Sequence, residues 1–434
     1  SYAQLSCLQH EYSRILSLPF LNMGHKQGNT SMVPSPIVAI GASHASVQLA
    51  ASLRHAGYSG DIVIVGAEPH LPYNRPPLSK TLLTQQVSFD KTLLRQQSFY
   101  DKHNIQLKLG ARVKSISRED SQITLDKGET ISYSKLVIAT GADPIVLNLP
   151  GEQLKGIGYL RNYDDAQSLM PYIKEGKSAV VVGGGYIGLE TAAALSNAGM
   201  VVTVLEGMER VLQRVTSPVI SAFYTKAHVT RGVNIVTNAQ AMEFVGRHRV
   251  EAVKCSNGKS YPADLVVIGV GVYPNTSLAT DAGLNVTNGI NIDKFGRTED
   301  PNIFAIGDCT NFPCHFTKTR LRLESVPNAL EQAKSAAAYI CGKELPHQAL
   351  PWFWSDQYDL KLQIAGINVG FDDIVILGNM EDEQFSAWYF AGDRLLAVDA
   401  INSTQDFIKA KQLMSEGQSI SKQALKQDNY KSHR

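Results

Sequence analysis

The feature that most constrains this fold is a pattern that occurs twice: an apolar strand, a glycine-containing turn and an alanine-rich helix. The first copy reads VAIGASHAS at residues 38–46 and the second reads VVVGGGYIG at residues 180–188, with Gly41 and Gly183 lying 142 residues apart. A buried strand that turns through glycine into a helix is typical of parallel α/β sheets, where the helix N-terminus offers its N–H groups to phosphate. The repeat therefore predicts two nucleotide-binding modules in one chain.

The second turn has the full spacing of a dinucleotide-binding turn. Gly183 permits the tight turn, Gly185 lets the backbone approach a pyrophosphate, and Gly188 lets the helix pack against the strand. In the first turn Gly41 remains, but serine replaces the two later glycines. The Cβ atom of a serine at the second position crowds a pyrophosphate, while its hydroxyl offers a hydrogen bond, so the sequence leaves the strength of the first site open.

An acidic residue ends the strand that follows each turn. Glu206 lies 23 residues after the first glycine of its turn, and Glu68 lies 27 residues after its own. Both separations are near the ~20 residues expected for an acid that binds a ribose. A carboxylate at Glu206 favours the ribose 2′-hydroxyl of NADH over the 2′-phosphate of NADPH, although Arg210 and Arg214 follow closely and weaken this preference.

Composition narrows the class of protein further. The net charge is +1 and apolar residues make up 44% of the chain, so neither nucleic acid nor an anionic membrane is expected as a general partner. No apolar run approaches the ~18 residues that span a bilayer. The five cysteines are scattered, which indicates reduced thiols and a cytoplasmic protein. No cluster of residues suggests a metal site.

Five longer stretches carry a family resemblance. They read VGAEPHLPYNRPPLSK (65–80), ATGADP (139–144), AIGDC (305–309), ESVPNALEQAKSAAAYICGK (324–343) and PWFWSDQYDLKLQIAG (351–366). Together they resemble the FAD-dependent, NADH-oxidising ferredoxin reductases of the putidaredoxin reductase and rubredoxin reductase type. The resemblance covers about residues 34–412.

The resemblance, together with the repeat, implies a fold class: α/β, with two Rossmann-like dinucleotide-binding domains, for FAD and NAD, and a C-terminal α+β domain. Met32 lies just before the first strand, so the residues before it are expected to be foreign to the fold; a short natural arm is the alternative. The expected parts are an N-terminal extension (1–33), the first part of the FAD-binding domain (34–150), the NAD-binding domain (151–277), the second part of the FAD-binding domain (278–347), a C-terminal interface domain (348–414) and a flexible polar tail (415–434).

The resemblance also implies site residues. Lys80 is expected near the isoalloxazine ring, Glu190 near the nicotinamide and paired with Lys80, and Trp354 beside both rings, which gives these three residues catalytic roles. A solvated lysine, a helix-surface glutamate and a core tryptophan are the plainer alternatives. The expected FAD-binding residues are Gly41, Ser43, Ala45, Glu68, Arg75, Lys80, Val113, Thr140, Gly141, Arg161, Asp308 and Val326, and the expected NAD-binding residues are Gly183, Gly185, Gly188 and Glu206.

The function that the resemblance implies is electron transfer from NADH, through FAD, to a small iron–sulfur protein, a ferredoxin or rubredoxin that supplies a monooxygenase or dioxygenase. The protein is expected to be a monomer or a weak homodimer. The stretch KTRLR at 318–322 is a candidate basic patch for an acidic acceptor, and a solvated loop is the alternative.

Two other functions stay open. An NADH oxidase or disulfide reductase needs a redox thiol beside the flavin, but residues 34–150 contain no cysteine, and Cys309 and Cys314 are interpreted as free thiols. The serines of the first turn leave room for a protein that has lost FAD and only binds NADH.

Overall fold

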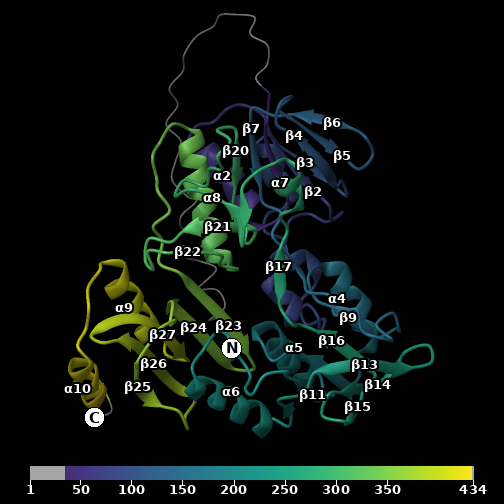
Figure 1. Cartoon of the computed structure of the whole chain (residues 1–434), viewed down its shortest axis with the longest axis vertical. Coiled ribbons are helices and arrows are strands. Elements are labelled where there is room, and N and C mark those ends of the chain that lie inside the picture. The colour runs from purple at the N-terminus through teal and green to yellow at the C-terminus, as the bar shows by residue number, and fades with distance from the viewer. Residues whose placement is uncertain (1–34, 433–434) are drawn as a thin grey trace, which may run out of the picture. The chain divides into compact units, whose positions relative to one another are not determined.

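The computed structural model of the protein describes residues 35–432 (Figure 1). The expected N-terminal extension, with Met32 and Cys7, lies outside these residues. The first sheet is parallel and has the strand order β20-β7-β1-β2-β3. Its strands are β1 (Ile37–Ile40), β2 (Ile62–Gly66), β3 (Ile105–Leu109), β7 (Lys135–Ile138) and β20 (Ile303–Ala305).

Both faces of the first sheet are covered. Strands β1 and β2 are buried at every residue, as their continuous apolar sequences IVAI and IVIVG predict for a parallel sheet. Helices α2 (His44–His55) and α8 (Val326–Ile340) pack together against one face, where Leu49 and Leu53 share a buried cluster with Ala333 and Ala336 (Figure 1). Small alanine side chains let the two helices approach closely.

The second sheet repeats the plan of the first. Its order is β12-β11-β10-β16-β9, so each strand has a counterpart in the first sheet: β10 for β1, β11 for β2 and β16 for β7. The edge strand β20 comes late in the chain, after the second module. The elements of this layer are β9 (Ile157–Tyr159), β10 (Ser178–Val182), β11 (Val201–Leu205), β12 (Asn234–Val236), β16 (Leu265–Ile268), α4 (Tyr163–Leu169), α5 (Tyr186–Asn197) and α6 (Pro218–Thr230).

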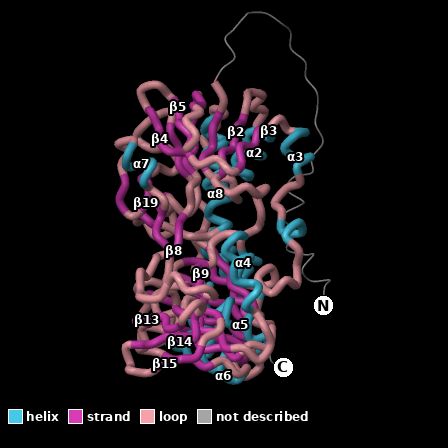
Figure 2. The backbone as a smooth tube through the Cα atoms, turned by 90° about the vertical axis from the view of Figure 1, so that its right-hand side faces the viewer, coloured by secondary structure: helices cyan, strands magenta, loops and turns pink. Residues whose placement is uncertain are grey.

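Smaller antiparallel sheets accompany the two parallel ones. Each module carries a three-stranded sheet, and helix α7 lies beside strand β4 of the first of them (Figure 2). Strands β8 and β17 pair with each other and connect the modules. The bounds are β4 (Val113–Ser117), β5 (Gln122–Leu125), β6 (Thr130–Ser132), β8 (Ala142–Pro144), β13 (Ala241–Gly246), β14 (Val250–Cys255), β15 (Ser260–Pro262), β17 (Val272–Pro274), β18 (Val286–Thr287), β19 (Gly289–Asn291), β21 (Thr310–Pro313), β22 (Arg320–Leu321), α3 (Gln97–Lys102) and α7 (Ser277–Asp281).

The C-terminal sheet is antiparallel, in the order β23-β24-β27-β26-β25. The expected fold class, two Rossmann-like modules and a C-terminal α+β domain, is thereby confirmed. The strands are β23 (Trp352–Gln357), β24 (Leu360–Gly366), β25 (Asp373–Asn379), β26 (Gln384–Ala391) and β27 (Arg394–Ile401), and the helices are α9 (Thr404–Ser415) and α10 (Lys422–Ser432).

The end of the chain differs from the flexible tail expected from sequence. Helix α10 occupies part of that stretch, and Leu425 is fully buried in the core of the C-terminal domain, beside Val375 and Phe390. The Lys422 ammonium lies 2.9 Å from a carboxylate oxygen of Asp373. Leu425 thus anchors a helix whose sequence is mostly polar. Within residues 35–432, no helix has the length and apolar character that crossing a bilayer requires.

Candidate functional site

One continuous cavity joins the two modules and the C-terminal sheet. Its volume is ≈ 1910 Å³, well above the roughly 300–1,000 Å³ of an ordinary ligand site. Strand ends of both parallel sheets open into it, where open α/β sheets place their ligands. Every predicted site residue except Gly188 lines this cavity: Gly41, Ser43, Ala45, Glu68, Arg75, Lys80, Val113, Thr140, Gly141, Arg161, Gly183, Gly185, Glu190, Glu206, Asp308, Val326 and Trp354.

The first glycine of each turn has the same backbone conformation. Gly41 has φ 109° and Gly183 has φ 108°, a region that disfavours residues with a side chain. A Cβ atom at Gly41 would lie 2.1 Å from the carbonyl oxygen of Ala139, and one at Gly183 would lie 2.4 Å from that of Gly269. The glycine that both turns retain is therefore the one that the backbone requires.

The second position of the turn tolerates serine. A Cβ atom added at Gly185 would meet no atom of the described chain within 4 Å, because this position faces the cavity. Ser43, its counterpart, is extended, with φ −146° and ψ −162°, and its hydroxyl accepts a hydrogen bond of 3.3 Å from Nε of Arg75. The serine therefore needs no change of backbone conformation and adds a polar atom to the site.

The third position differs between the modules. A Cβ atom at Gly188 would lie 1.9 Å from the carbonyl oxygen of Gly183, so glycine is needed there. The first module accommodates Ser46 at the equivalent place, fully buried, and within residues 35–432 its hydroxyl has no hydrogen-bond partner. The difference lies in helix packing behind the turn and not in the surface that faces a ligand.

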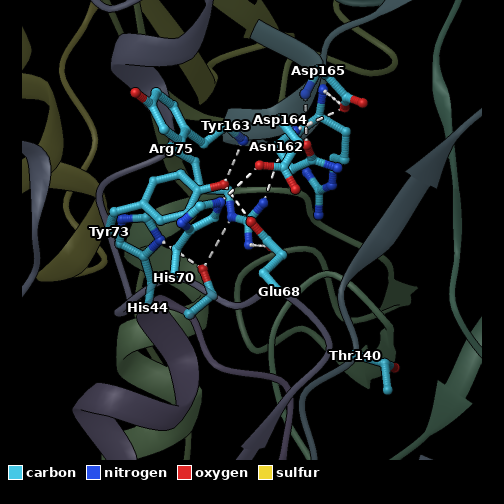
Figure 3. Close-up of polar contacts among 12 residues, drawn as sticks. His44, Glu68, His70, Tyr73, Arg75, Thr140, Asn162, Tyr163, Asp164 and Asp165 are labelled. Atoms are coloured by element: carbon cyan, nitrogen blue, oxygen red, sulfur yellow. Dashed lines mark hydrogen bonds and ion pairs between the residues drawn. The ribbon is translucent and has the colours of Figure 1, made fainter. Parts of the chain in front are cut away.

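A polar cluster surrounds the acid of the first module (Figure 3). The Glu68 carboxylate forms an ion pair with the Arg75 guanidinium and accepts a hydrogen bond of 2.6 Å from the Tyr73 hydroxyl. The Arg75 guanidinium also donates to the carbonyl oxygen of Arg161, at 3.0 Å. Because burial raises the pKa of Tyr73, its hydroxyl stays a donor. Glu68 and Arg75 are thus fixed at the edge of the cavity.

A second ion pair lies between the modules. The Lys80 ammonium is 2.7 Å from a carboxylate oxygen of Glu190, and these side chains are 18% and 3% exposed. Lys80 comes from the loop after β2, whereas Glu190 lies in the first turns of α5. The structure therefore brings together the pair that sequence analysis expects, between the two turns. Trp354, on β23, lies on the same cavity.

A longer ion pair joins Arg161, which follows β9 of the second sheet, to Asp308, which follows β20 of the first. Nη2 of Arg161 lies 3.8 Å from a carboxylate oxygen of Asp308. Burial raises the pKa of Asp308, and Arg161 and Arg75 act in the opposite direction. Val326 begins α8, whose N-cap Ser325 accepts a hydrogen bond from the backbone N–H of Asn328. The N-terminus of this helix therefore faces the cavity.

In the second module, Glu206 is held by the backbone. Its carboxylate accepts hydrogen bonds from the N–H groups of Gly184, at 2.7 Å, and Met208, at 2.8 Å. The Arg210 guanidinium donates to the carbonyl oxygens of Thr216 and Gln213, so it is turned toward the start of α6. The carboxylate expected to bind a ribose is thus held in a fixed position beside the second turn.

The basic stretch at 318–322 is exposed at Lys318 and Arg320 and partly buried at Arg322. Arg320 donates to the carbonyl oxygen of Ile292, at 2.9 Å. Arg322 donates to the side chain of Asn288, at 3.0 Å, and forms an ion pair with Glu324. The ion pair offsets the charge of Arg322, whereas the contact of Arg320 with a carbonyl oxygen fixes its guanidinium without offsetting its positive charge.

Sequence analysis missed several buried polar residues. The His44 ring lies 3.0 Å from the side-chain oxygen of Asn74, and burial lowers the pKa of His44 to about 4, so the ring is neutral. Hydroxyls of Ser79 and Ser355 donate to the Glu190 carboxylate, at 2.6 and 2.8 Å. Ser79 and Ser355 stand inside conspicuous motifs, but no local pattern shows which side chain each one meets.

The thiols of the described residues do not reach the surface of the cavity. Of the cysteines in the described chain, none lines it. Cys309 is fully buried, and burial raises the pKa of its thiol, which disfavours the reactive thiolate. Among residues 35–432, no group of three or more histidine, cysteine or acidic side chains is placed to hold a metal ion.

Two dinucleotide-type turns that open on one cavity define a protein of the class that binds two dinucleotides together, which the family resemblance identifies as FAD and a nicotinamide nucleotide. The residues present fit FAD at the first turn: its second position faces the cavity, and Arg75, Arg161 and the N-terminus of α8 offer positive charge or donors there. Gly41, Ser43, Arg75 and Asp308 would hold it, with Lys80 beside the reacting end.

Comparisons with known proteins agree. Residues 35–333 match the family described as pyridine nucleotide-disulphide oxidoreductase, and residues 352–431 match the reductase C-terminal domain. Putidaredoxin reductase CamA of Pseudomonas putida is 40% identical over 386 residues, 88% of this chain and 92% of that protein. Rhodocoxin reductase of Rhodococcus erythropolis is 40% identical over 380 residues, 87% of this chain and 89% of that protein. The crystal structure of the covalent putidaredoxin reductase–putidaredoxin complex contains a chain with TM-score 0.88 and 40% identity, covering 90% of this chain and 95% of that one.

The chain belongs to the pyridine nucleotide-disulphide oxidoreductase family, within its group of ferredoxin reductases of the putidaredoxin reductase type. The resemblance noted in the sequence is confirmed. Enzymes of this family use FAD and a nicotinamide nucleotide, so the chain is a flavoprotein oxidoreductase.

Proposed function

We propose that this protein is a reductase that takes electrons from NADH and delivers them to a small iron–sulfur protein serving an oxygenase. The observation that carries the proposal is the ion pair of Lys80 and Glu190, which lies between the FAD-type turn and the NAD-type turn on a single cavity. Lys80 and Glu190 would lie beside the reacting ends of two nucleotides held at these turns.

The residues of the chain supply orientation and electrostatics. When bound, FAD provides the chemistry that converts a two-electron donor into a one-electron source. Lys80 presents a fixed positive charge that favours electron density on a nearby ring, and Glu190 holds that charge in place. No general base is required, because hydride transfer depends above all on alignment. The proposed catalytic residues are therefore Lys80, Glu190 and Trp354.

Preference for NADH is supported by the second module. Glu206 offers an acceptor to a ribose hydroxyl and repels a phosphate group, and Arg210 is committed to carbonyl oxygens of the loop before α6. Arg214 is exposed and lines the cavity, so it is the residue that opposes this preference. The balance favours NADH, because the carboxylate is rigidly held by two backbone donors.

A small iron–sulfur acceptor is supported by the relatives. One solved relative is a covalent complex of a reductase with putidaredoxin. The cavity of the present chain contains no cysteine among its described residues, so a disulfide reductase mechanism has no thiol to use. We further propose that the protein works in the cytoplasm as a monomer or weak homodimer.

The experiment is a visible spectrum of the purified full chain, followed by NADH added without oxygen and then by oxidised putidaredoxin. The proposal expects a flavin spectrum that bleaches with NADH and recovers as putidaredoxin is reduced. A colourless protein that does not take up added FAD would overturn the flavin assignment and favour an NADH-binding protein. Rubredoxin and a plant-type ferredoxin are tested as acceptors as well. If NADH reduces the flavin but only oxygen or a disulfide reoxidises it, the result favours an NADH oxidase or disulfide reductase instead.

A further inference from the structure

A line of buried polar side chains leads away from the ion pair. It starts at Glu190, whose carboxylate accepts a hydrogen bond of 2.8 Å from the Ser355 hydroxyl. The Ser355 oxygen accepts one of 3.3 Å from the amide nitrogen of Gln357. Ser355 and Gln357 alternate along β23, and both are fully buried. The strand therefore directs this pair toward α5 and α6.

The line continues to the surface through α6. The amide oxygen of Gln357 lies 2.9 Å from Nε2 of His228, which is fully buried. Nδ1 of His228 lies 3.1 Å from the hydroxyl of Tyr358. Tyr358 is half-buried, and the Arg231 guanidinium lies 5.0 Å from the centre of its ring. Five side chains from α5, α6, β23 and the turn after β23 thus form one connected row from the ion pair to the edge of the protein.

The Glu190 carboxylate, at one end of the row, determines which atom donates in each hydrogen bond. An ionised carboxylate only accepts, so the Ser355 hydroxyl donates to Glu190 and its oxygen must accept from Gln357. The Gln357 nitrogen is then the donor, which leaves its oxygen to accept from Nε2–H of His228. A neutral imidazole with a proton on Nε2 has an unprotonated Nδ1, and this atom accepts from the Tyr358 hydroxyl.

Titration behaviour agrees with this order. Burial lowers the pKa of His228 to about 4, so the ring is neutral at pH 7 and one of its nitrogens is an acceptor. Burial also raises the pKa of Tyr358 to about 12, so its hydroxyl keeps the proton that it donates. The carboxylate end of the row therefore determines the tautomer of His228, and the Tyr358 hydroxyl, which can donate, is compatible with it.

We propose that Gln357 and His228 are positioning residues for the Lys80–Glu190 pair, because they form an ordered row of donors, Tyr358 to His228 to Gln357 to Ser355, that ends on the Glu190 carboxylate. This rests on the function proposed above, since the pair matters through the flavin. Aligned hydrogen bonds polarise one another, so the row strengthens the last bond and fixes the carboxylate that holds Lys80. It also gives a role to Ser355 and Gln357, the alternate residues of the motif WSDQY, which are buried and do not line the cavity.

The first test measures the tautomer and needs no activity. The full chain, as purified, is labelled with ¹⁵N-histidine, and long-range ¹H–¹⁵N spectra are recorded at pH 7. His228→Gln identifies the signal among the 11 histidines. We expect a neutral ring protonated on Nε2. A ring protonated on Nδ1, or on both nitrogens, would overturn the row.

The second test separates hydrogen bonding from packing. In His228→Gln, an amide donates to Gln357 and accepts from Tyr358, so the direction is kept; in His228→Leu it is broken at similar volume. We expect flavin reduction by NADH, followed in a stopped-flow instrument, to fall roughly tenfold in His228→Leu and to stay within about threefold of wild type in His228→Gln. His248→Leu, at an exposed histidine in the β13–β14 hairpin, is the matched control.

The outcomes are distinct. The positioning role is wrong if flavin reduction by NADH is as fast in His228→Leu as in wild type. It is also wrong if His228→Gln and His228→Leu slow this reduction equally. If the wild-type protein holds no flavin or is not reduced by NADH, the proposed function fails, while the tautomer measurement still decides whether the row exists. His228 does not line the cavity, so a change in rate cannot come from direct contact with either nucleotide.

Discussion

At the scale of single residues, the choice of nucleotide depends on Glu206. Replacing it with glutamine removes the charge that repels a 2′-phosphate and weakens the bonds to the N–H groups of Gly184 and Met208. We expect the ratio of kcat/KM for NADH to that for NADPH to fall about tenfold, since a hydrogen bond to a charged group contributes roughly 1.5–3 kcal/mol. Steady-state kinetics with both nucleotides measure this. Glu209→Gln, at the exposed neighbouring acid, is the control, and an unchanged ratio in Glu206→Gln would contradict the assignment.

Ser43 shows what a departure from the glycine pattern means. Its counterpart Gly185 has open space where a Cβ atom would be, so the chain itself leaves room for the serine side chain at the edge of the cavity. We expect Ser43→Gly to change the affinity for FAD by less than about threefold and Ser43→Val to lower it at least tenfold, because the branched side chain extends into the cavity. Fluorescence titration of FAD into flavin-free protein checks both variants. Much tighter binding in Ser43→Gly would show that the serine is a defect.

At the scale of elements, local sequence patterns predict those helices, strands and turns that depend on interactions between residues close in sequence. The strands, turns and helices of both modules follow from apolar runs, from glycine at a positive φ, and from alanine-rich helices. The Lys80–Glu190 pair was predicted through family resemblance. The Ser355–Gln357–His228 row was not, because its contacts to α5 and α6 join positions 129–165 residues apart, and only tertiary packing brings them together.

Helix α10 was missed for a related reason. Its composition is polar, and one leucine makes no periodic pattern, yet Leu425 is fully buried. We expect Leu425→Ala to lower the free energy of unfolding of the C-terminal domain by about 2 kcal/mol, the lower end for a buried leucine because the helix lies near the end of the chain. Urea unfolding followed by tryptophan fluorescence measures this, with exposed Gln427→Ala as the control. Equal stability of the two variants would mean that Leu425 does not anchor α10 to the C-terminal domain.

At the scale of the whole molecule, a buried carboxylate joins the second module to the C-terminal sheet. Asp399 on β27 is fully buried and accepts hydrogen bonds of 2.6 Å from both Thr216, before α6, and Tyr389 on β26. Its second oxygen has no partner within the part of the chain that the structure describes. Burial raises the pKa of Asp399 from 3.8 to about 6, against the effect of those two hydroxyls.

This carboxylate makes stability depend on pH in a defined direction. Because folding raises the pKa of Asp399, the unfolded chain loses this proton near pH 4, whereas the folded protein keeps it until about pH 6. The free energy of unfolding therefore falls as the pH rises from 4 to 6, and this group causes no further change above that interval. We expect Asp399 to lower the free energy of unfolding by about 2 kcal/mol between pH 4.5 and pH 7. Asp399→Asn keeps the shape without the charge, so its stability relative to wild type should increase by that amount over the same interval, whereas exposed Asp393→Asn should show no such trend. Chemical unfolding of the three proteins at both pH values tests this, and a parallel pH dependence of wild type and Asp399→Asn would show that the contact between module and sheet does not carry a buried charge.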